Sequence, residues 1–118
     1  MNVTKFLKSF TYAFAGIRAA AKEQNFCFHL ISAVIVSVLA AVTKVSTVEW
    51  LVLVLIMALV LSLEMINSAI ERVVDLATTE IHPLAKLAKD LAAGAVLIAA
   101  GASVIIGLII FIPKWFNL

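Results

Sequence analysis

The chain has 118 residues, of which 64% are hydrophobic and only 14% are charged, and its formal net charge is +2. A soluble domain of this length could not bury so much apolar surface, because small domains have a high ratio of surface to volume. The small net charge and the lack of any block of basic residues argue against nucleic-acid binding. The single cysteine excludes an intramolecular disulfide. The composition therefore predicts one membrane-embedded domain over residues 1–118.

The first predicted element is an amphipathic helix over residues of about 4–22. Apolar residues recur there at helical spacing with basic residues among them: Phe6, Phe10, Ala13, Phe14 and Ile17, with Lys5, Lys8 and Arg18. This pattern is typical of a helix that lies in the membrane interface with its aromatic side inward. A frayed hydrophilic leader is the alternative, and the aromatic repeat disfavours it.

Three apolar segments follow, at about 26–43, 48–66 and 91–112, and each is long enough to cross hydrocarbon. Each must be helical there, since lipid offers no water to satisfy open backbone groups. Residues 78–83 interrupt the pattern, and Pro83 suits the first turn of a new helix. The third segment is rich in small residues, which favours close packing between helices.

The basic residues predict the orientation of the chain. Four lysines and arginines precede the first span, and three lie between the second and third spans. The turn between the first and second spans holds one, and the C-terminal tail holds one. The positive-inside rule then places the N-terminus and the second connection in the cytoplasm and the C-terminus outside.

Four polar residues near the end of the second span form a stripe. Glu64, Asn67, Glu71 and Asp75 share an arc of about 80° on a helix. Neighbouring carboxylates repel unless cations relieve them, and a carboxylate at membrane depth is costly. Oxygen ligands of this kind suit Mg²⁺ together with substrate phosphates. The stripe thus indicates a nucleotide site at the membrane surface.

Lysines that could meet phosphates follow at Lys86 and Lys89, with Asp90 beside them. Two blander interpretations stay open at this point. Charged residues at the end of a span can be ordinary solvated caps, and Lys86 and Asp90 can form a simple i,i+4 pair. A non-enzymatic channel or proton-relay protein could also carry Glu64 as an intramembrane carboxylate. The chain has no glycine-rich phosphate loop.

The segment EMINSAIERVVD at residues 64–75, followed by AKD at 88–90, resembles the signature of the prokaryotic diacylglycerol kinase family. The similarity covers nearly the whole chain and implies a homotrimeric all-α bundle, in which each chain has a surface helix and three transmembrane helices. HPLAK at 82–86, AAGAV at 92–96 and the tail at 107–114 look like the Gram-positive members, which act as undecaprenol kinases. The resemblance implies ATP- and Mg²⁺-dependent phosphorylation of undecaprenol to undecaprenyl phosphate in a bacterial plasma membrane. Diacylglycerol phosphorylation to phosphatidic acid is the close alternative.

The resemblance also implies a role for each site residue. Glu64 is the general base that takes the proton of the lipid hydroxyl, while Glu23 and Glu71 hold Mg²⁺. Arg18 and Glu64 contact the lipid substrate, and sites are shared between neighbouring chains. The ATP-binding set is Tyr12, Glu23, Asn67, Glu71, Asp75, Glu80, His82, Lys89 and Asp90. His29 is assigned to packing or to a hydrogen bond, and the roles of Lys5 and Cys27 stay open.

Overall fold

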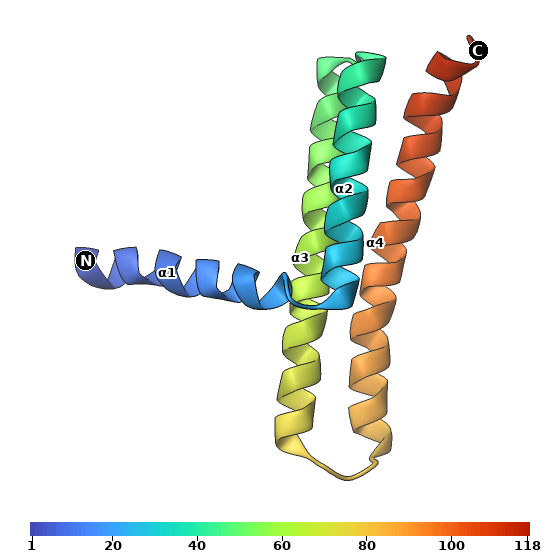
Figure 1. The fold of residues 1–118 in the computed structure, drawn as a ribbon. Coiled ribbons are helices and arrows are strands. Elements are labelled where there is room, and N and C mark those ends of the chain that lie inside the picture. Colours follow the sequence, from blue (N-terminus) through green and yellow to red (C-terminus); the bar gives the residue numbers. More distant parts are fainter.

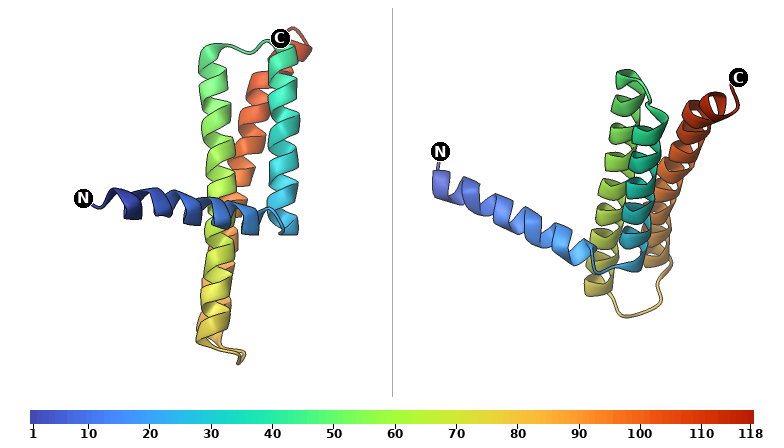
Figure 2. Two further views of the ribbon diagram at one scale, coloured as in Figure 1. Left: turned by 60° about the vertical axis from the view of Figure 1, so that its left-hand side comes forward. Right: turned by 45° about the horizontal axis from the view of Figure 1, so that its top comes forward.

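The structure is a computed structural model that describes residues 1–118 and is entirely helical. Its helices are α1 (Val3–Ala20), α2 (Gln24–Thr43), α3 (Thr47–Ala77) and α4 (Pro83–Trp115). Helices α2, α3 and α4 run side by side, whereas α1 points away from them at a steep angle (Figures 1 and 2). The last three helices are long and apolar enough to cross a membrane. The predicted all-helical fold with three apolar spans is therefore confirmed.

Local side-chain contacts fix where these helices begin. The Asn2 side chain accepts a hydrogen bond from the Lys5 backbone N–H at 3.1 Å and so caps α1. Ser46 and Glu49 form a reciprocal capping box at the start of α3. At α4, His82 Nδ1 accepts from the Leu84 N–H at 3.1 Å. The helix then starts at Pro83, which confirms the start expected from the sequence.

Helix lengths show where the chain exceeds a bilayer. With a rise of about 1.5 Å per residue, the 20 residues of α2 span about 30 Å, the thickness of a hydrocarbon core. The 31 residues of α3 and the 33 of α4 span about 46 and 50 Å. The excess lies at one end, because both helices continue past the level of α1 toward the 78–82 loop (Figure 1). This overhang and the 78–82 loop together carry most of the predicted nucleotide residues.

The apolar core lies at the opposite end of the bundle, around Leu53, Ala40 and Phe111. Two polar contacts close that end. Lys114 Nζ lies 2.7 Å from Glu49 Oε2, and Trp115 Nε1 donates a hydrogen bond to Thr43 Oγ1 at 3.0 Å. A single chain buries only 14 of its 118 residues. Most of its apolar side chains are therefore free to contact lipid or another chain.

Candidate functional site

The predicted stripe forms a column along α3 whose burial changes with depth. Glu64, Asn67 and Ser68 are only 4–5% exposed, whereas Glu71 and Asp75 are exposed. Ser68 contacts Glu23 in the turn after α1, so it marks the level at which α1 meets the bundle. From Ser68, Glu64 lies about 6 Å along the axis in one direction and Asp75 about 10 Å in the other. The column thus joins a buried end to an open end.

Glu23, the residue before α2, is held against α3 by two side chains. Ser68 Oγ donates a hydrogen bond to Glu23 Oε2, and Arg72 Nη2 lies 2.6 Å from Glu23 Oε1. Arg72 also donates to the Ser68 carbonyl oxygen at 3.3 Å. The Ser68 hydrogen bond, and next the Arg72 guanidinium, hold the pKa of Glu23 below its ordinary value of 4.5. Glu23 is therefore an ionised carboxylate at neutral pH.

Glu71 is held by the preceding turn of the same helix. Asn67 Nδ2 donates to Glu71 Oε1 at 3.3 Å, while Asn67 Oδ1 is buried and has no hydrogen-bond partner. Two consecutive residues of α3 thus bind the two carboxylates assigned to Mg²⁺. Asn67 donates a hydrogen bond to Glu71, and Ser68 donates one to Glu23. One chain brings together no group of three or more acidic, histidine or cysteine side chains that could hold a metal. The oxygen-donor chemistry of Glu23 and Glu71 nevertheless suits Mg²⁺, which commonly takes one or two carboxylates together with substrate phosphates.

A second polar cluster lies where the overhangs of α3 and α4 meet the connecting loop. Lys89 Nζ lies 2.6 Å from Asp75 Oδ1, across the two helices. Both line an open cavity of about 530 Å³, together with Glu80 and His82 from the loop. This volume is in the range of small-molecule sites. The structure therefore gathers four predicted nucleotide residues around one space.

Other predicted residues are placed differently. The Asp90 carboxylate lies 2.5 Å from Lys86 Nζ, so these two form the local i,i+4 pair that the sequence allowed as an alternative. Tyr12 is 70% exposed and lies on α1, which points away from the column (Figure 1). Arg18 is also exposed, in the last turn of α1. Within a single chain, Tyr12 therefore stands apart from the acidic column.

Three residues in the site were given no role there by the sequence. Ser68 and Arg72 bind Glu23, and their i,i+4 spacing beside the acidic stripe was the available signal. His29 is the third: its Nε2 lies 4.0 Å from Glu64 Oε2, and the two side chains are 18% and 5% exposed. This contact joins residues 35 positions apart, so no local pattern could show it.

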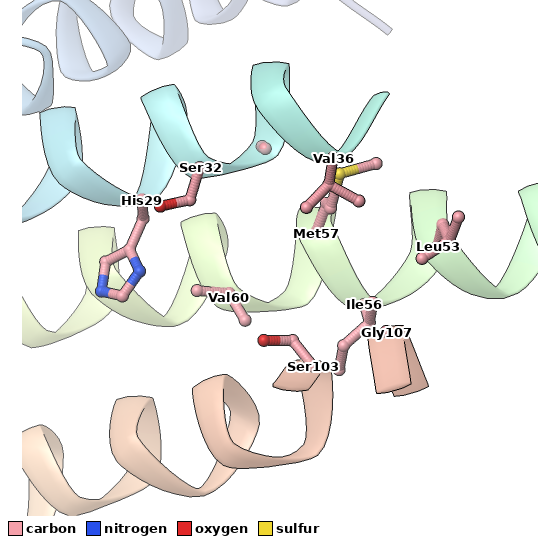
Figure 3. A pocket seen from close by; sticks show the side chains of 10 residues that line it. His29, Ser32, Val36, Leu53, Ile56, Met57, Val60, Ser103 and Gly107 are labelled. Carbon is pink, nitrogen blue, oxygen red and sulfur yellow. The ribbon is translucent and has the colours of Figure 1, made fainter. Parts of the chain in front are cut away.

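The buried end of the column opens on apolar space. Glu64, His29 and Asn67 line a cavity of about 220 Å³ whose other walls include Ala93, Val96 and Leu97 of α4. His29 also lines a deeper cavity of about 90 Å³, on which Val60 of α3 and Ser103 of α4 converge with it (Figure 3). A ligand with a polar head and a hydrocarbon body matches these surroundings.

These features define a helical membrane protein with a carboxylate-rich site that faces apolar space at one end and solvent at the other. The model of the prokaryotic diacylglycerol kinase family matches residues 11–111. The chain is 47% identical to an undecaprenol kinase of Bacillus subtilis, over 96% of this chain and 93% of that one. It is 44% identical to a diacylglycerol kinase of Synechocystis, over 95% of this chain and 65% of the relative. A diacylglycerol kinase of Escherichia coli is 36% identical, over 86% and 84% of the two chains.

The chain therefore belongs to the prokaryotic diacylglycerol kinase family. It is a lipid kinase, a transferase that acts on a membrane lipid with a nucleotide as co-substrate. Membership in this family favours an enzyme over the channel or proton-relay alternative.

Proposed function

We propose that this protein transfers the γ-phosphate of ATP to undecaprenol and so produces undecaprenyl phosphate. The observation that carries the proposal is the column on α3, in which one rigid helix joins the buried Glu64 to the open cluster of Asp75 and Lys89. The choice of undecaprenol rests on the 47% identity to an undecaprenol kinase over 96% of the chain. Diacylglycerol, the substrate named for the Synechocystis and Escherichia coli relatives, is the competing lipid.

Glu64 acts as the general base in this reaction. The lipid hydroxyl oxygen attacks the γ-phosphorus of ATP, and the hydroxyl proton passes to the Glu64 carboxylate. The bond between the γ-phosphorus and the oxygen bridging it to the β-phosphorus breaks, so ADP leaves with that electron pair. Glu64 has no lysine or arginine partner, and its only ion-pair contact is with His29. Its carboxylate is therefore available to a lipid hydroxyl in the adjoining cavity.

The residues at the open end bind the nucleotide. Glu23 and Glu71 would hold Mg²⁺, which supplies positive charge to neutralise the phosphates when bound. Lys89 exchanges its Asp75 partner for a phosphate oxygen, as a point charge. The remaining nucleotide contacts are assigned to Tyr12, Asn67, Asp75, Glu80, His82 and Asp90.

The working unit is a homotrimer of 118-residue, single-domain chains with sites shared between neighbours. The support is that α1 carries Tyr12 away from the column of its own chain and leaves Arg18 exposed, with the aromatic residues of α1 at least half exposed. A neighbouring chain would place them beside its acidic column. In a bacterial plasma membrane α1 lies in the inner interface, the 78–82 loop is cytoplasmic and the C-terminus is outside, as the distribution of basic residues favours.

The test is lipid phosphorylation by the purified protein in phospholipid vesicles. Labelled ATP is supplied with Mg²⁺ and with undecaprenol or diacylglycerol in separate reactions, and the labelled lipid is extracted. Undecaprenyl phosphate should form faster than phosphatidic acid, and chelation of Mg²⁺ should stop both reactions. Faster labelling of diacylglycerol would reassign the substrate and leave the mechanism in place. If the protein does not bind ATP at all, the result would favour the channel or proton-relay alternative over a kinase.

A further inference from the structure

His29 lies at the junction between the catalytic carboxylate and the apolar cavities. It is on the second turn of α2 and lines three adjoining cavities, one of them shared with Glu64 and Asn67. Its ring meets the neighbouring Phe28 ring edge to face, with centroids 5.6 Å apart. Figure 3 shows the imidazole extending from α2 into the space between the helices. Its Nε2 faces Glu64 Oε2 at 4.0 Å.

Glu64 needs such a partner because, within one chain, no other helix contributes an ion pair or hydrogen bond to its carboxylate. The α4 residues around the same cavity, Ala93, Val96, Leu97 and Ala100, are all apolar. Arg72 and Lys89 are engaged elsewhere, with Glu23 and Asp75 respectively. A glutamate side chain with no cross-helix contact would sample several rotamers, and a base must lie within hydrogen-bond reach of the proton it takes. Asn25 and His29 are the polar side chains of α2 that line this cavity, and His29 is the one that forms an ion-pair contact with Glu64.

We propose that His29 is a positioning residue for the lipid kinase reaction, whose Nε2–H holds one oxygen of Glu64 so that the other faces the lipid hydroxyl. This inference rests on the proposed role of Glu64 as the base. The present separation of 4.0 Å is longer than a hydrogen bond, which needs about 2.7–3.2 Å. A small side-chain rotation would close it, and catalytic hydrogen bonds commonly tighten only when substrate is bound.

Positioning and packing predict opposite results for two replacements of His29. His29→Phe fills the same space with a ring but removes the N–H donor. His29→Gln keeps an N–H donor on a flexible chain of similar reach. If the imidazole orients Glu64, the Phe variant loses turnover and the Gln variant recovers much of it. If the imidazole only fills space among Phe28, Val36 and Val60, the order is reversed.

The experiment compares kcat, the KM for ATP and thermal unfolding for the wild type, His29→Phe, His29→Gln and the control Ser37→Ala. Ser37 lies two turns along α2, donates to the Ala33 carbonyl oxygen and does not line the Glu64 cavity. We expect kcat to fall about 10- to 100-fold in His29→Phe, the scale of a misplaced catalytic group. The KM for ATP and the unfolding temperature should stay near those of the wild type, and Ser37→Ala should keep wild-type kcat.

A kcat for His29→Phe within about twofold of the wild type would overturn the inference. A Gln variant as defective as the Phe variant would also overturn it. These failures are distinct from a failure of the proposed function. In that case the wild type itself phosphorylates no lipid, or Glu64→Gln remains active.

Discussion

Lys89 offers the sharpest test of whether the open cluster binds nucleotide, because its effect on stability and its effect on ATP binding should differ in size. Replacing Lys89→Met removes the ion pair to Asp75, whose partners are 40% and 67% exposed. Ion pairs this open to solvent contribute only about 0–1 kcal/mol to the free energy of unfolding. A lysine that bonds a phosphate oxygen contributes about 1.5–3 kcal/mol to binding. We therefore expect ATP to bind about 10- to 150-fold more weakly, with little loss of stability.

Lys86→Met is the matched control for this prediction. Lys86 lies one turn before Lys89 on α4 and forms a comparably exposed ion pair, with Asp90 at 2.5 Å and side chains 77% and 58% exposed. Its loss removes the same charge from the same edge of the bundle. Lys86 lines the same cavity, but the family resemblance assigns the phosphate contact to Lys89 and not to Lys86. The KM for ATP should therefore rise much less in the Lys86 variant than in the Lys89 variant. Stability should change by a similar small amount in both.

The assay is lipid phosphorylation as a function of ATP concentration, with equilibrium binding of a non-hydrolysable ATP analogue measured in parallel. Both are repeated at low and high salt, since an exposed ion pair is screened and a phosphate contact in a closed complex is screened less. Equal KM values for the Lys89 and Lys86 variants would refute the reasoning. The Lys89–Asp75 pair would then be an ordinary solvated contact at the end of a span.

Three further predictions concern the carboxylates of the column. Glu64→Gln should reduce lipid phosphorylation by at least about 100-fold, because an amide accepts no proton, while gel filtration still shows a folded oligomer; near-normal turnover would mean that another group takes the proton. Glu71→Gln should raise the Mg²⁺ concentration for half-maximal activity at least about tenfold, the loss of one charged contact, and an unchanged metal titration would exclude Glu71 as a ligand. Ser68→Ala should lower the free energy of unfolding by about 1 kcal/mol at pH 7 without divalent cations. Because the pKa of Glu23 is lowered in the folded state, this stabilisation is present above about pH 4.5 and is lost as the pH falls through that lowered pKa. A difference between wild type and Ser68→Ala that persists in acid-titrated urea unfolding would contradict this cause.

The parts of the fold that local patterns determine were predictable from the sequence. Uninterrupted apolar runs indicate the spans because a helix in lipid needs about 20 apolar residues. The missing N–H of Pro83 fixes the start of α4, and the 3.6-residue period gathers Glu64, Asn67 and Glu71 on one face of α3. All of these depend on residues that are close in sequence.

The contacts of Glu23 were not predictable, because they depend on the turn that joins α1 to α2. That turn brings Glu23 to Ser68 and Arg72, 45 and 49 positions later. It also directs α1 away from the bundle, so Tyr12 is far from the column to which the family resemblance assigned it. The spacing of apolar residues in α1 does not determine the direction in which this helix leaves the bundle. The 3.6-residue period places Glu64, Asn67 and Glu71 along one face of α3, whereas no pattern in the sequence says where Tyr12 lies relative to that face.

The depth of Glu64 finally bears on the choice between a kinase and a channel. With α1 in the interface as proposed, the turn at Glu23 sets one membrane boundary near Ser68. Half of a hydrocarbon core of about 30 Å corresponds to about 10 residues of helix, so the midplane falls near residue 58. Residues 56–60 of α3, between Ile56 and Val60, are wholly apolar, whereas Glu64 lies only about 6 Å inside the boundary. A proton relay needs acids across the midplane, but a base for a lipid alcohol needs to lie where the hydroxyl head of the lipid lies, which is just inside the boundary.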